Sequence, residues 1–110
     1  MGAQSEVTIV EGYPSLYNDP EKARIAMQVL GKILGENNVI LLPQRMTTED
    51  FARYSQFMPA TFLRLGVKGR QACGKLHTAD FFADPGALPI GVQTLCSLAM
   101  ADSYPVINCQ

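Results

Sequence analysis

Residues 39–42 are Val39-Ile40-Leu41-Leu42, and this short apolar run decides the fold expected for the chain. Polar residues do not alternate with it, and Asn38 and Pro43 bound it. Such a run is typical of a strand that is covered on both faces, as in a parallel sheet. The sequence therefore predicts an interior strand at 39–42 and an α/β fold around it.

A helix is predicted immediately before this strand. Asp19-Pro20-Glu21 is a strong helix opening, because Asp19 can cap free N–H groups and Pro20 is tolerated at the first helical position. Apolar residues then recur at helical spacing, and Gly35 stands where a left-handed cap belongs. We expect one face of this helix to lie against the sheet.

A second helix and another strand are predicted after 39–42. Thr47 or Thr48 can cap a short helix over 49–57, and 61–65 has the composition of a strand that ends at Gly66. Strand, helix and strand in succession favour a right-handed parallel crossover. The expected fold class is α/β, with a partial parallel or mixed sheet and flanking helices.

The N-terminal end of the chain adds one predicted strand to this fold, and the C-terminal end adds one predicted helix. Residues 6–11 alternate polar and apolar types, which favours a half-buried strand, and the connector 13–18 is the only candidate domain boundary. Asp84-Pro85 opens a last helix that runs to about Ala101. Its apolar stripe comprises Leu88, Val92, Leu95, Leu98 and Ala99.

Composition excludes several classes of function. The chain has 110 residues, 47% of them apolar, and a net charge of -1, so nothing favours nucleic-acid binding. Three cysteines at irregular spacing do not form the disulfide framework of a small secreted domain. Neither a signal peptide nor a run of ~20 apolar residues is present. We expect a soluble, cytoplasmic protein with no membrane partner.

His77 is the only histidine, and the residues alone leave its role open. An imidazole can bind a metal, move protons or fill a polar niche, and the structural role is the most common. Cys73 and His77 have the spacing of half a zinc site, but the second pair is missing. A Cys73 nucleophile with His77 as its base would lack an orienting third group. The glycines between 66 and 76 do not have the spacing of a phosphate-binding loop.

A series of short motifs carries a family resemblance. The motifs are Gly12-Tyr13-Pro14, Met46-Thr47-Thr48-Glu49-Asp50-Phe51, Pro59, Leu65-Gly66, Leu76-His77-Thr78 and Leu88-Pro89-Ile90-Gly91. In this order and register they resemble the C-terminal part of the metal-dependent amidohydrolases, which include hippurate hydrolase, the auxin-conjugate hydrolases and aminoacylase.

The resemblance implies that the chain is part of a larger, dizinc-exopeptidase-like enzyme. Such enzymes have an α/β catalytic domain that is interrupted by a smaller lid domain, and the lid commonly mediates dimerisation. In this mapping residues 1–12 are the end of a lid-domain strand, 13–18 the hinge and 19–110 the C-terminal part of the catalytic domain. We therefore also expect a homo-oligomer.

The resemblance also implies site residues. His77 falls on the last metal ligand of a site for two divalent ions, zinc or manganese, and Thr48 and Glu49 fall beside the substrate cleft. The catalytic glutamate and the other ligands belong to upstream motifs, so no residue of this chain is predicted to be catalytic. The family pattern is broken at Pro59-Ala60, where it has Pro-Gly, and at Phe82, where it has an acid.

The function so implied is that of a fragment of a hydrolase that cleaves amide bonds in N-acyl amino acids or small peptides and is inactive alone. The alternative is a non-catalytic α/β module that self-associates through a sheet edge or apolar patch. The first hypothesis places His77 on an exposed loop beyond the strand 61–65. It also places the turn at 47–50 on the same side of the sheet.

Overall fold

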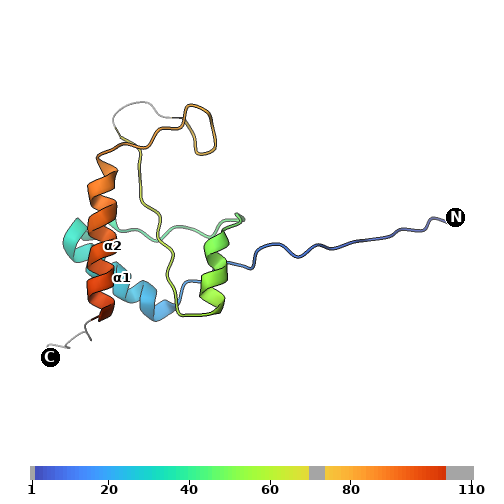
Figure 1. The fold of residues 1–110 in the computed structure, drawn as a ribbon, viewed down its shortest axis with the longest axis horizontal. Helices are drawn as coiled ribbons and strands as arrows, with labels where there is room; N and C mark the ends of the chain where they lie inside the picture. Colours follow the sequence, from blue (N-terminus) through green and yellow to red (C-terminus); the bar gives the residue numbers. More distant parts are fainter. Residues whose placement is uncertain (1, 70–73, 104–110) are drawn as a thin grey trace.

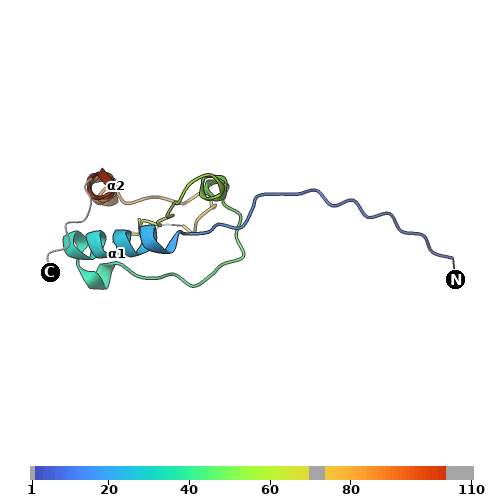
Figure 2. The same ribbon diagram turned by 90° about the horizontal axis from the view of Figure 1, so that it is seen from below.

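The computed structural model describes residues 2–69 and 74–103, with only the backbone for 102 and 103. Within this part the elements are α1 (Pro20–Leu34), the 3₁₀ helices η1 (Glu36–Asn38) and η2 (Asp50–Gln56), and α2 (Ala87–Ser103). The helix α2 crosses α1 and packs against it (Figures 1 and 2). Cys73 and Cys109 lie outside the described residues.

The predicted α/β sheet is wrong, because the described residues contain no strand. Residues 6–11, 39–42 and 61–65 are extended, yet none of them pairs with another in a ladder. From Ile40 to Thr48 no backbone hydrogen bond is present in the described part of the chain. An extended segment becomes a strand only when a neighbour takes up its backbone groups, and the residues that the structure describes place no such neighbour there.

The helix α1 forms where the sequence predicts it and for the expected local reasons. Asp19 accepts hydrogen bonds from the backbone N–H groups of Glu21 at 3.1 Å and Lys22 at 2.9 Å. Gly35 ends the helix with φ 90°, although its ψ of 136° is not that of a left-handed helical cap. Ala26 and Leu30 are the buried residues of the inward face.

The segment predicted as a second α-helix is the 3₁₀ helix η2. Its cap is Glu49 and not Thr47 or Thr48, since the Glu49 carboxylate accepts from the Phe51 N–H at 3.4 Å. The Phe51 ring lies 5.4 Å from the ring centroid of Phe62, which holds η2 against the extended segment 61–65.

The helix α2 begins at Ala87, three residues after the predicted opening at Asp84. Asp84 instead forms the turn before it, where its Oδ1 accepts from the Gly86 N–H at 2.7 Å. A Cβ at Gly91 would lie 3.1 Å from Leu65, so the glycine lets α2 approach 61–65 closely.

Asn18 fastens the connector 13–18 to the extended segment at 60–62. Its Nδ2 donates to the Phe62 carbonyl at 3.2 Å, and its Oδ1 accepts from the Phe62 N–H at 2.8 Å. The Asp19 N–H donates to the Ala60 carbonyl at 2.8 Å. We call these three bonds the Asn18 clasp. The residues before the connector run away from the body of the chain (Figures 1 and 2).

The core is small for a chain of this length. Among residues 2–69 and 74–101, the buried apolar residues are Ala26, Leu30, Ala52 and Ala87, of which three are alanines. The accessible surface is 10014 Å², whereas a folded monomer of this mass exposes roughly 6,000 Å². The radius of gyration is 19.1 Å, against about 13 Å for a compact chain of this length. The chain therefore leaves much apolar surface exposed.

We predict that Asn18→Ala loosens the clasp. The substitution removes both partners of the Phe62 backbone groups, a loss of about 1 kcal/mol per hydrogen bond. Hydrogen exchange at the Phe62 amide should become faster, and the helical signal in circular dichroism should melt at a lower temperature. Asn37→Ala is the control, because Asn37 is also exposed and makes none of these bonds. Equal exchange at Phe62 in the two variants would contradict the role of the clasp.

Candidate metal and substrate site

His77 lies in a tight turn between Lys75 and Thr78. The Thr78 N–H donates to the Lys75 carbonyl at 3.1 Å, which makes His77 the third residue of the turn. Its φ is 67°, the only positive φ of a non-glycine residue in the described part of the chain. Turns with positive φ at this position favour Gly or Asn, so His77 adopts a conformation that costs roughly 1–3 kcal/mol.

The loop around His77 is closed by further local contacts. The Gly74 N–H donates to the Asp80 carbonyl at 3.0 Å, and the Phe81 N–H donates to the Thr78 carbonyl at 3.1 Å. A Cβ at Gly74 would meet the Asp80 carboxylate and the Thr78 hydroxyl, so a larger residue would force these side chains to shift. The loop therefore fixes the backbone on both sides of His77.

The Thr78 hydroxyl lies within hydrogen-bond reach of two acceptors in this loop, and its single proton can go to only one of them at a time. It donates to the Lys75 carbonyl at 2.6 Å, and its hydrogen bond with Asp80 is the main cause that lowers the pKa of that carboxyl from its ordinary value. The Asp80 backbone N–H lowers the pKa further. The Asp80 carboxylate is thus engaged within the loop.

The prediction that His77 is exposed is confirmed. Within the described part of the chain its imidazole makes no hydrogen bond, so it is not a satisfied histidine of the core. The other half of that prediction fails, because 61–65 is not a strand and has no sheet end beside which the loop could lie.

Thr48 and Glu49 lie at the start of η2, away from any contact with the His77 loop. Thr48 is exposed and Glu49 is half-buried, with its carboxylate used as the cap of η2. No hydrogen bond or ring contact joins 47–50 to 74–81, both of which the structure describes in full. A role of Thr48 and Glu49 in substrate binding stays a prediction.

The described residues do not make a metal site by themselves. No group of three or more His, Cys, Asp or Glu side chains among them is arranged to hold an ion. His77 supplies one nitrogen, whereas a bound zinc ion takes at least three protein ligands. A metal at His77 would therefore need donors from outside the described residues.

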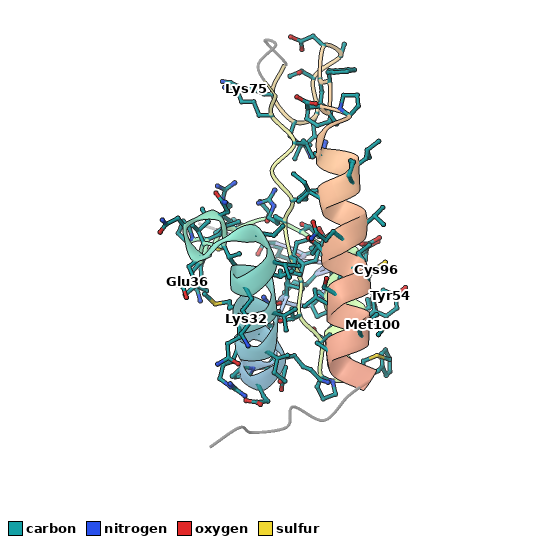
Figure 3. All side chains as sticks on the ribbon, turned by 90° about the vertical axis from the view of Figure 1, so that its left-hand side faces the viewer. Lys32, Glu36, Tyr54, Lys75, Cys96 and Met100 are labelled. Atoms are coloured by element: carbon teal, nitrogen blue, oxygen red, sulfur yellow. The ribbon has the colours of Figure 1, made fainter. Side chains whose placement is uncertain are left out.

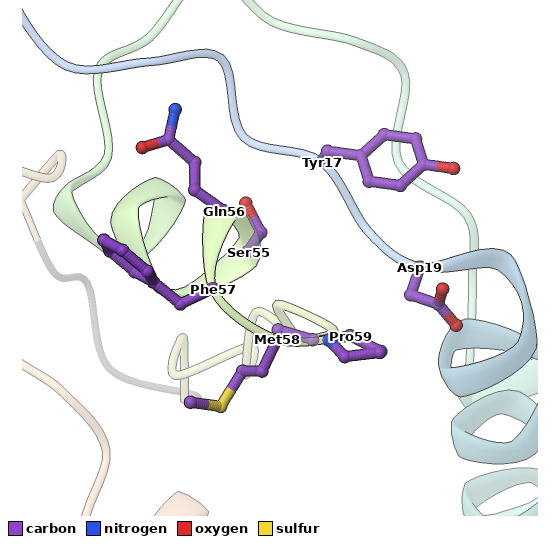
Figure 4. A pocket seen from close by; sticks show the side chains of 8 residues that line it. Tyr17, Asp19, Ser55, Gln56, Phe57, Met58 and Pro59 are labelled. Atoms are coloured by element: carbon purple, nitrogen blue, oxygen red, sulfur yellow. The ribbon is translucent and has the colours of Figure 1, made fainter.

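The structure also has a pocket of about 320 Å³ that the sequence does not reveal. It lies between η2 and the connector, beside the Asn18 clasp (Figure 4). Its one titratable carboxyl, Asp19, already caps α1. The lining residues are Tyr17, Asp19, Ser55, Gln56, Phe57, Met58, Pro59 and Ala60. The pocket exists only because two distant segments meet, so no local pattern predicts it.

Among the described residues, no helix has the length and apolar character needed to cross a membrane.

Comparison with known proteins identifies the class to which the chain belongs. Residues 4–101 match the family described as peptidase family M20/M25/M40. The chain belongs to this family, and the resemblance to metal-dependent amidohydrolases is confirmed.

Three curated relatives illustrate the match. The "IAA-amino acid hydrolase ILR1-like 6" of Arabidopsis thaliana is 31% identical over 105 residues, which are 89% of this chain and 22% of that protein. The "Thermostable carboxypeptidase 1" of Saccharolobus solfataricus is 30% identical over 90% of this chain and 25% of its own length. A Rhodococcus jostii protein with a glutamate–cysteine ligase name is 31% identical over 84% of this chain and 12% of its own length.

The chain thus spans a quarter or less of each of these relatives. No solved structure is significantly similar to it.

We predict that Thr78→Val raises the pKa of Asp80 toward its ordinary value near 3.8, because the main hydrogen bond to the carboxylate is lost. The native pKa is lowered, so the Asp80 carboxylate stabilises the loop above the ordinary pKa, and this contribution is lost as the pH falls through the native value. An NMR titration of the Asp80 side chain measures the shift. Thr47→Val is the control, and an unchanged Asp80 pKa in Thr78→Val would refute the assignment.

Proposed function

We propose that this chain is the C-terminal part of a metal-dependent hydrolase that cleaves amide bonds in N-acyl amino acids or small peptides. The observation that carries the proposal is His77, an exposed and unengaged imidazole within the range that matches the family. In this proposal His77 is one ligand of a site for two divalent ions, zinc or manganese, and the chain is inactive alone.

The names of the relatives support the proposed substrate class. One of them is named as a hydrolase of IAA-amino acids and another as a carboxypeptidase. A conjugated amino acid and a peptide C-terminus share an amide bond whose leaving group is an amino acid. Thr48 and Glu49 are proposed to lie beside such a substrate, with Thr48 as the donor, because the Glu49 carboxylate can only accept and already caps η2.

The proposed division of the chain follows the Asn18 clasp. Residues 1–12 are assigned to the end of a lid-domain strand, 13–18 to the hinge and 19–110 to the catalytic domain. The clasp supports this assignment, since it ties the end of the connector to 60–62 while residues 2–12 leave the body of the chain. A hinge with one fixed end and one free end is suited to joining two domains.

A second candidate is a non-catalytic module that self-associates, as either a dimer or a larger homo-oligomer. The side chains of Ile40 and Leu41 are 71% and 80% exposed, and two adjacent exposed apolar residues favour a contact with another copy of the chain at this segment. This candidate needs no metal and no substrate. The two candidates differ in whether His77 matters.

We predict that the isolated chain retains no zinc after equilibrium dialysis and hydrolyses no N-acyl amino acid. One imidazole leaves most of the coordination sphere to water, and such a site binds zinc weakly. Stoichiometric zinc together with turnover would contradict this expectation and would require further ligands in residues 70–73 or 104–110.

The proposed function itself is tested in a chimera. This chain replaces the aligned segment of the Arabidopsis ILR1-like 6 hydrolase, and turnover of IAA-amino acids is measured. We expect the chimera to be active and His77→Ala to lower its turnover by roughly hundredfold, as for a lost metal ligand. Lys75→Ala, an exposed change in the same turn, should leave turnover unchanged. An active chimera in which His77→Ala has no effect would refute the role of His77.

A further inference from the structure

The helix α2 carries apolar residues on its packed side and also on an exposed side. On the inner side Ala87 is buried and Gly91 lies against Leu65. On the outer side three large residues remain exposed, and we call them the α2 stripe: Leu88 at 68%, Val92 at 62% and Leu95 at 70%. Their spacing of four and three residues places them one above another on a single helix face.

The stripe continues toward the C-terminal end of α2. Cys96 and Met100 lie on the side of the helix that faces away from α1 (Figure 3), and both are exposed. Asp102, near the C-terminal end of α2, is the only charged residue in this helix. Surface helices normally carry charged residues on the side opposite their apolar face, and a helix that is apolar all round is normally buried.

A lipid surface is a poor candidate for covering this stripe. Helices that lie on membranes carry Lys or Arg on their polar face, and α2 has neither. No described helix is long and apolar enough to cross a bilayer.

A second copy of the chain would cover too little of the exposed surface. The accessible surface of 10014 Å² exceeds that of a folded monomer of this mass by roughly 4,000 Å². Part of this excess surface lies on the N-terminal segment 2–12. A stable dimer of standard size buries only about 800 Å² on each partner, which is much less than the excess. Most of the excess would remain exposed after dimerisation.

We propose that the α2 stripe is the docking face for the rest of an M20 catalytic domain. The partner surface that contacts the stripe is apolar and uncharged. The chain aligns with 22% of the Arabidopsis hydrolase, so most of that protein lies outside the matched segment. This inference rests on the proposed function, because it takes the remainder of the same enzyme as the partner.

The test uses the 110-residue chain and the Arabidopsis ILR1-like 6 hydrolase from which the aligned segment has been deleted. Binding is measured by titration calorimetry, and hydrogen exchange is followed over 88–95. We expect a complex, added protection of this helix face, and a roughly hundredfold weaker affinity for the double variant Val92→Glu with Leu95→Glu, which places two charges in the contact. Gln93→Glu adds a charge to the same helix beside the stripe and should weaken binding much less.

The outcomes separate the docking face from the proposed function. If the chain binds and the double variant binds equally well, the docking inference fails, whereas the activity of the chimera still decides the function. If the chain does not bind but sediments as a dimer that the double variant dissociates, a second copy is the occupant and the inference is overturned. Binding to anionic lipid vesicles that the double variant abolishes would overturn it as well. Helix content by circular dichroism checks that the variants fold, and exchange in the unmodified chain tests the face without any substitution.

Discussion

Backbone hydrogen bonding is the constraint on which this structure depends. A helix satisfies its N–H and C=O groups within its own segment, so α1 and α2 form from local sequence alone. An extended segment needs a neighbour for the same purpose, and among the described residues the stretch 40–48 has none. The chain consequently contains helices whose backbone groups are paired within the helix, and extended segments such as 40–48 whose backbone groups are not paired in the described structure. The Asn18 clasp is the exception, because a side-chain amide takes the place of a neighbouring strand at Phe62.

The same distinction explains which parts of the fold could be predicted from the sequence. The limits of α1 follow from Asp19, Pro20 and Gly35, which act within a turn of the helix ends. The apolar run 39–42 has the composition of an interior strand, but strand pairing depends on residues far away in sequence. The prediction of a sheet was therefore wrong for the described chain.

The candidate site was predictable in part. The exposure of His77 agrees with its position in a glycine-rich loop, whereas its positive φ could not be foreseen, because turns with this geometry favour other residues. The cap of η2 was misassigned to Thr47 or Thr48, since three successive residues can each accept the hydrogen bond and only the backbone geometry selects Glu49. Strain at an exposed imidazole is a common mark of a functional position.

The lack of further metal ligands around His77 and the exposure of the apolar face of α2 have one common explanation in the proposed function. His77 offers a single donor, and α2 offers an apolar face with no cover in the described structure. A second copy would bring another His77 and another α2 stripe, which covers some apolar surface but adds no new kind of ligand. The remainder of an M20 catalytic domain would supply both different donors and a large apolar surface. The hydrolase hypothesis therefore accounts for two independent features with one partner, whereas self-association accounts for only one of them.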